Sequence, residues 1–115
     1  MEDNHPQYYL GMFQKLINNH LNYQKGLIEM FKTADPALNM KDIEAAGEHL
    51  LYKNAWEYIE KFDLEDSYSQ KILEKSNLKD LKRAIKLSLI YYEKGEEYEK
   101  CAFLKKLLDS SNSYS

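Results

Sequence analysis

The residues best suited to chemistry in this chain are three histidines and one cysteine: His5, His20, His49 and Cys101. The histidines lack the spacing typical of a zinc hydrolase or a di-iron bundle. His20 falls on an apolar helical stripe, which favours a core or interface histidine over a metal ligand. Lys100 and Lys105 would favour the thiolate form of Cys101, but a small buried cysteine at a helix contact is the more common arrangement. We therefore expect a non-enzymatic protein with no catalytic residues, no metal site and no cofactor.

A basic segment, Lys71–Lys86, is the best candidate for contact with nucleic acid. Its candidate contact residues would line one outer helix face beside phosphates, and they are Lys75, Lys79, Lys82, Arg83 and Lys86. Arg83 is the single arginine, although arginine is the residue that most often reads bases through paired hydrogen bonds. Since the formal net charge is −3, an ordinary solvated helix face is the favoured interpretation and nucleic-acid binding is the alternative.

Acidic and basic residues are concentrated in different parts of the chain. Residues 35–66 contain nine acidic side chains against three lysines, and residues 67–94 contain seven basic side chains against three acidic ones. We expect the two regions to attract each other within the fold. The effect should be small, because an exposed ion pair contributes only about 0–1 kcal/mol.

Aromatic and aliphatic residues point to contact with another protein. The chain has ten tyrosines, more than a 115-residue interior can hold, and tyrosine packs its ring while its hydroxyl stays in water. The segment Leu87–Tyr92 is apolar nearly all round its helix, which indicates burial on more than one side or cover by a partner. The candidate partner-binding residues are Phe13, Leu16, His20, Tyr23, Leu87, Ile90, Tyr91 and Tyr98. A homodimer is the simplest form of such association, because one self-complementary patch suffices.

Hydrophobic periodicity predicts an all-α fold, an irregular bundle of four to five helices that ends in a helical hairpin. Helices are expected over residues 8–33, 42–62, 78–94 and 96–109, with a further short one over 69–75. Asp42 and Asn77 are the expected N-cap residues. Pro36 should end the first helix near Thr33. No segment alternates as a strand does, and valine is absent.

Gly95 separates the last two predicted helices, and it should supply the left-handed conformation that ends a helix cheaply. The two helices should then pack on each other as a hairpin. The residues expected at this contact are Ile85, Leu89, Tyr92, Tyr98, Cys101, Ala102 and Leu108.

Composition predicts a single helical domain over residues 1–110 and a flexible tail over 111–115. The chain has 43% hydrophobic and 30% charged residues, typical of an ordered protein. It lacks an apolar run near the ~20 residues of a membrane span and a secretory signal, so neither a membrane partner nor export is expected. A lone cysteine fits a reducing, cytoplasmic location. The rich use of Lys, Asn and Tyr is typical of an AT-rich genome, such as that of a low-GC bacterium or its phage.

The segment Tyr98–Leu108 resembles the second helix of the UVR motif, a helical hairpin of bacterial excision-repair proteins and of some chaperone-protease adaptors. The matching residues are Tyr98, Glu99, Cys101, Ala102, Leu104 and Leu108. Lys105 and Lys106 stand where the motif usually has Arg and Asp. The stretch from Gly95 to Ala102 also resembles the turn of a tetratricopeptide repeat. Both resemblances imply a hairpin used for contact between proteins, and a small adaptor or regulator that binds another protein, with self-association, is the expected function.

Overall fold

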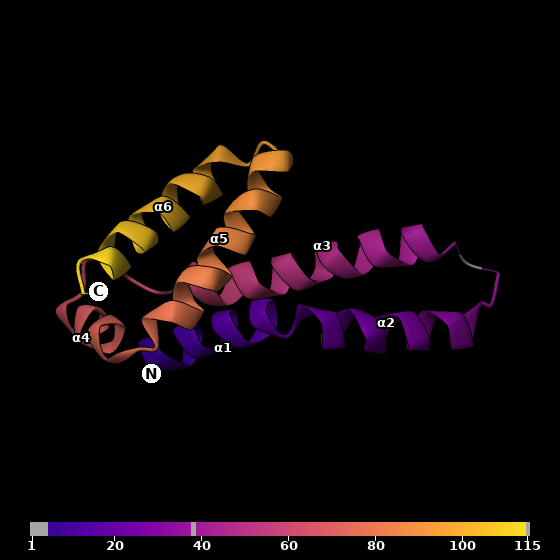
Figure 1. Cartoon of the computed structure of the whole chain (residues 1–115), viewed down its shortest axis with the longest axis horizontal. Coiled ribbons are helices and arrows are strands. Elements are labelled where there is room, and N and C mark those ends of the chain that lie inside the picture. Colours follow the sequence, from indigo (N-terminus) through magenta and orange to yellow (C-terminus); the bar gives the residue numbers. More distant parts are fainter. Residues whose placement is uncertain (1–4, 38, 115) are drawn as a thin grey trace.

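The computed structural model describes residues 5–37 and 39–114, except for the side chains of Leu21 and Tyr23. Its elements are α1 (Pro6–Asn18), α2 (His20–Ala34), α3 (Met40–Ile59), α4 (Ser67–Lys75), α5 (Leu78–Lys94) and α6 (Tyr98–Asn112). Figure 1 shows α1 and α2 end to end along one side of α3, with α5 and α6 as a hairpin across the other end. The all-α prediction is confirmed, whereas the described residues form six helices instead of four or five.

The expected single helix over residues 8–33 is wrong, because the chain bends at Asn19, between α1 and α2. Two consecutive asparagines have low helix propensity. The amide of Asn18 donates to the carbonyl oxygen of Asp80 (3.1 Å), which ties the end of α1 to the start of α5. The Nδ1 atom of His20 lies 3.1 Å from the carbonyl oxygen of Ile17, within the turn that α1 would need to continue. Side-chain contacts with the backbone of this kind compete with helix continuation.

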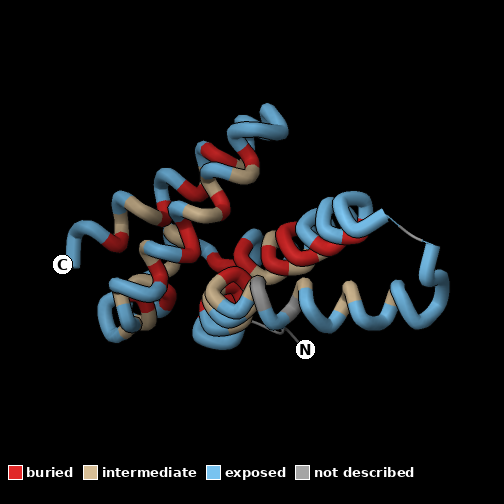
Figure 2. Tube along the Cα trace, turned by 45° about the vertical axis from the view of Figure 1, so that its right-hand side comes forward, coloured by how far each residue is buried: buried red, intermediate tan, exposed pale blue. Residues whose placement is uncertain are grey.

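The hydrophobic core lies where α1, α3, α5 and α6 meet, and Figure 2 shows the buried positions gathered there. Its fully buried large side chains include Phe13, Ile17, Leu51, Ile59, Leu81, Ile85 and Leu104. Pro6 starts α1 at the first helical position, where its missing N–H is not needed. The short helix α4 covers one end of this core through the buried Leu73.

Helix α2 and the first half of α3 form a two-helix arm that extends away from the core (Figure 1). The molecule is accordingly elongated, with principal extents of 51, 32 and 26 Å. Gly47 lies in the middle of α3 and does not split it, and a Cβ there would lie 3.3 Å from Cδ1 of Leu27. The absence of a side chain at Gly47 therefore lets the two helices of the arm approach closely.

Two helix starts test the predicted caps. Asn77 caps α5 as expected, since its side-chain oxygen accepts from the backbone N–H of Asp80 (3.2 Å). Asp42 does not cap α3: the cap is Asn39, whose side-chain oxygen accepts from the N–H of Lys41 (2.8 Å). Asn39 lies in extended backbone and satisfies a free N–H donor in the first turn of α3. The cap is therefore three residues earlier than expected.

The turn between α5 and α6 differs from the expected one by one residue. Gly95 has a φ of −84°, and Glu96 adopts the left-handed conformation with a φ of 57°. The N–H of Glu97 bonds to the carbonyl of Tyr92 (3.0 Å), and the N–H of Glu96 bonds to that of Glu93 (3.2 Å). This is the Schellman arrangement, in which glycine is usual at the position that Glu96 holds.

Glu96→Gly should therefore raise the free energy of unfolding by about 1 kcal/mol, because it relieves a left-handed non-glycine residue and removes a negative charge from a helix C-terminus. Gly95→Ala should be neutral or stabilising by up to about 1 kcal/mol, since the added Cβ meets only ordinary contacts. Urea unfolding followed by circular dichroism checks both variants. Destabilisation by Glu96→Gly would contradict the assigned turn.

The phase of α6 also differs from the prediction. Its buried residues are Cys101, Leu104, Leu107 and Ser111, whereas Tyr98 is 65% exposed and Ala102 is exposed. Leu89 of the predicted hairpin contact is only half-buried. The leucines at 104, 107 and 108 fit either of two helical faces, so the pattern alone did not select one. The helix also continues three residues beyond the expected end at Asp109, and Tyr114 donates to the side-chain oxygen of Gln70 (2.8 Å).

Within the described residues, no helix combines the length and apolar character that crossing a membrane would require.

Candidate binding surface on α5

One outer face of α5 carries a row of basic residues that ends in two aliphatic ones. The row, called the α5 stripe below, consists of Lys79, Lys82, Arg83, Lys86, Leu87 and Ile90. Steps of three and four residues place these side chains on one side of the helix. They line a shallow hollow of about 400 Å³.

The opposite face of α5 fixes the stripe in place. Leu81, Ile85 and Tyr92 of that face are buried in the core. Asn77 caps the start of the helix, and its amide nitrogen also donates to a carboxylate oxygen of Asp80 (3.1 Å). The stripe is therefore a rigid surface, presented by a helix that cannot rotate without opening the core.

The charges of the stripe are not compensated within the part of the chain that the structure describes. The ion pair among the described residues joins Lys100 to Glu97 (2.8 Å), and neither residue belongs to the stripe. The stripe therefore combines four cations without a paired carboxylate and the side chain of Ile90, which is 54% exposed.

The structure unites residues that the sequence assigned to two different functions. Leu87 and Ile90 were candidates for protein contact, and the four cations were candidates for nucleic acid. Lys75, the fifth nucleic-acid candidate, lies in the last turn of α4 and does not line this hollow. In the sequence, these residues differ in chemical type, and the charged and the apolar ones were assigned separately. Their common helical spacing was the signal that could have placed them on one surface.

The other candidates for protein contact do not form one surface. Phe13 is 1% exposed and belongs to the core, so its assignment to a surface is wrong. His20 is half-buried beside Ile17. Tyr98 is 65% exposed on α6 and does not line the α5 hollow. The side chain of Tyr23 lies outside the described part of the structure.

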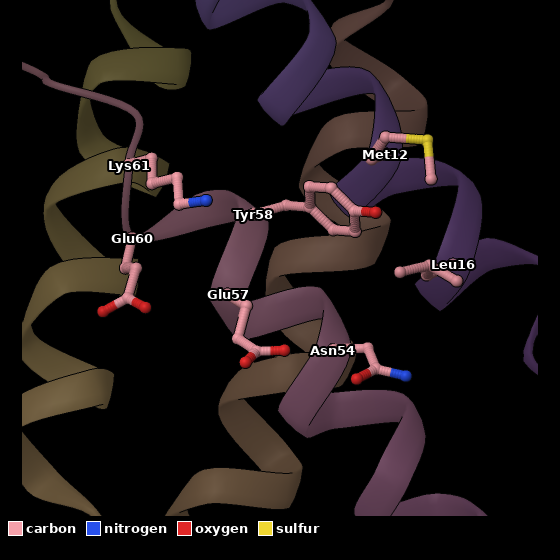
Figure 3. Close-up of a pocket in the computed structure, with 7 residues that line it drawn as sticks. All are labelled: Met12, Leu16, Asn54, Glu57, Tyr58, Glu60 and Lys61. Carbon is pink, nitrogen blue, oxygen red and sulfur yellow. The ribbon is translucent and has the colours of Figure 1, made fainter. Parts of the chain in front are cut away.

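Leu16 lies in a second hollow, the α1–α3 groove, of about 560 Å³. The groove is lined by Met12, Leu16, Asn54, Glu57, Tyr58, Glu60 and Lys61. Figure 3 shows Met12 and Leu16 projecting from α1, with the ring of Tyr58 near them and the carboxylates of Glu57 and Glu60 on the α3 side. The pKa of Tyr58 is raised, chiefly by a hydrogen bond with Tyr8. The groove thus pairs an apolar wall with an acidic one.

Tyr91 belongs to an aromatic cluster that joins α3, α5 and α6. Its ring stacks on Tyr52 with centroids 4.1 Å apart, and the hydroxyl of Tyr92 donates to the backbone carbonyl of Tyr52 (2.8 Å). Trp56 contacts Tyr92 edge to face, and the ammonium of Lys100 lies 5.0 Å from the centroid of the Tyr92 ring. These contacts hold the hairpin to α3, so Tyr91, which we expected at a partner-binding surface, has a structural role.

Cys101 is 3% exposed, and its pKa is raised by burial and by Glu93. It therefore stays a thiol, which disfavours the reactive thiolate that its neighbouring lysines suggested. Among the described residues, no group of three or more histidine, cysteine, aspartate or glutamate side chains is placed to hold a metal ion.

Comparisons with protein-family models, curated protein sequences and solved structures find no match to this chain. The α5 stripe and the α1–α3 groove are the features of the molecule that bear on its function.

Proposed function

We propose that this chain is a small non-enzymatic adaptor or regulator that binds an acidic, amphipathic surface of another protein on the α5 stripe. The observation that carries this proposal is the row of four unpaired cations that ends in the exposed Ile90 on a rigid helix. An acidic helix with leucines along one edge would place its apolar side on the aliphatic end and its carboxylates on the basic end. Such helix-on-surface recognition reads anchors at helical spacing.

Nucleic-acid binding is the second candidate, because the same four cations could contact phosphates. Phosphates would gain little from Leu87 and Ile90, which have no polar group to offer. The aliphatic end of the stripe therefore favours a protein partner over nucleic acid.

Binding of two fluorescent probes separates the two candidates. One probe is a designed helical peptide with glutamates on one face and leucines on the other, and the second is a DNA duplex. Ile90→Asn should weaken peptide binding about tenfold, since it removes part of an apolar burial worth about 1.5–3 kcal/mol. Lys86→Gln should weaken it by less, up to about fivefold, because exposed ion pairs contribute about 0–1 kcal/mol.

The matched controls are Met30→Asn and Lys25→Gln, which change exposed residues of α2, in the arm that extends away from the core (Figure 1), and should leave binding unchanged. The nucleic-acid function predicts the opposite pattern. Duplex binding would be insensitive to Ile90→Asn, would fall steeply with salt, and would lose about one unit of log–log salt slope with Lys86→Gln. That pattern, or peptide binding unaffected by both stripe variants, would contradict the proposal.

A further inference from the structure

We infer that the protein surface that fits the α5 stripe is the α1–α3 groove of a second copy of this chain, so that molecules join head to tail. This inference rests on the proposed function, because it names the partner of the same stripe.

The groove carries the negative charge that would complement the basic stripe. Its cation, Lys61, is engaged with a ring, since its ammonium lies 5.5 Å from the centroid of Tyr9. Glu57 and Glu60 are exposed, and no ion pair with another described residue compensates either carboxylate. The groove therefore presents net negative charge beside an apolar wall.

Both surfaces hold charge where their own helices disfavour it. Glu57 lies in the last turn of α3 and Glu60 is its C-cap, and that last turn contains no basic residue. A helix C-terminus carries partial negative charge, so carboxylates there repel it. Lys79 lies in the first turn of α5, where the partial charge is positive. A second copy that brings the two surfaces together relieves both repulsions.

The apolar parts also correspond. Ile90 and Leu87 form the aliphatic end of the stripe, and the half-buried Met12 and Leu16 form the apolar wall of the groove. Since the stripe and the groove are different surfaces, their contact is heterologous, and it propagates as an open chain unless its rotation closes a ring. Two small hollows predict a weak contact, at the low end of interface sizes. The assembly should therefore depend on concentration and dissociate at high salt.

Two variants, each with one surface disabled, test this inference by sedimentation velocity. Glu57→Lys/Glu60→Lys disables the groove and leaves the stripe intact. Lys86→Gln/Ile90→Asn disables the stripe and leaves the groove intact. The matched controls change the same residue types at exposed positions elsewhere: Glu44→Lys/Glu48→Lys on α3, and Lys25→Gln/Met30→Asn on α2. Circular dichroism verifies that all four variants stay helical.

The wild-type chain and both controls should form species larger than a dimer as concentration rises, and each disabled variant alone should stay monomeric. An equal mixture of the two disabled variants should form a one-to-one dimer and nothing larger, because one intact stripe and one intact groove remain. A monomeric wild-type chain, a monomeric mixture, or disabled variants that associate like the controls would overturn the inference. If the acidic peptide still binds the stripe in that case, the proposed function stands and only the identity of the partner is wrong.

Discussion

Phe13→Ala should lower the free energy of unfolding by about 3–5 kcal/mol, the range for truncating a large buried aromatic side chain. Phe13 is 1% exposed and lies in the core with residues of α3, α5 and α6. Small domains have a total stability of about 5–15 kcal/mol, so this loss is a large fraction of it. Equilibrium unfolding in urea, followed by helical circular dichroism, measures the change.

Tyr98→Ala is the matched control, because it truncates an aromatic residue that is 65% exposed. Its effect should stay within about 0.5 kcal/mol. The burial of Phe13 also sets the expected result of Phe13→Asp. At a partner-binding surface, where the sequence pattern put Phe13, this change would weaken association and leave helicity intact. Placed in the core, the buried carboxylate should unfold the chain. A folded, fully helical Phe13→Asp variant would show that Phe13 does not lie in the core.

Stability should fall more steeply between pH 10 and 12 than exposed groups alone would cause. Burial, with a smaller contribution from Glu48, raises the pKa of Tyr52 to about 12. Burial and Glu97 raise the pKa of Tyr92 further. A phenol whose pKa is raised in the folded state stabilises the fold fully below its unfolded pKa, near 10, and this stabilisation is lost as the pH rises through the folded value. Each such phenol changes the free energy of unfolding by up to about 1.4 kcal/mol per pH unit.

Comparison with Tyr92→Phe isolates this effect from that of other groups whose ordinary pKa lies in this range. The variant should begin about 0.5–1.5 kcal/mol less stable at pH 8, because it loses the hydrogen bond to the carbonyl of Tyr52. It should then lose stability more slowly than the wild type above pH 10, since phenylalanine does not ionise. The control is Tyr98→Phe, which removes the hydroxyl of a side chain that is 65% exposed. Urea midpoints at stepped pH, with tyrosinate absorbance recorded in parallel, provide the measurement, and equal slopes for all three chains would contradict the assignment.

The stripe could be partly predicted from the sequence, and the groove could not. The cations of Lys71–Lys86 and the aliphatic residues at 87 and 90 are visible as a pattern, and their common spacing already puts them on one helix face. The groove requires Met12 and Leu16 of one helix to lie beside Glu57 of another. No periodicity within either segment contains that relation.

Local signals in the sequence determined where most helices lie. The α-helical period, Pro6 at a helix start and the asparagine cap at 77 act over four residues or fewer, so the all-α class and the span of α5 follow from them. The break at Asn19 combines a local signal, the two consecutive asparagines, with a tertiary one, the bond from Asn18 to Asp80. The burial of Phe13 and the phase of α6 were decided by tertiary structure. Several faces of these helices are apolar enough to be buried, and the position of the neighbouring helices selects which face is buried. Burial depends on how the space between helices is filled, which no single segment determines.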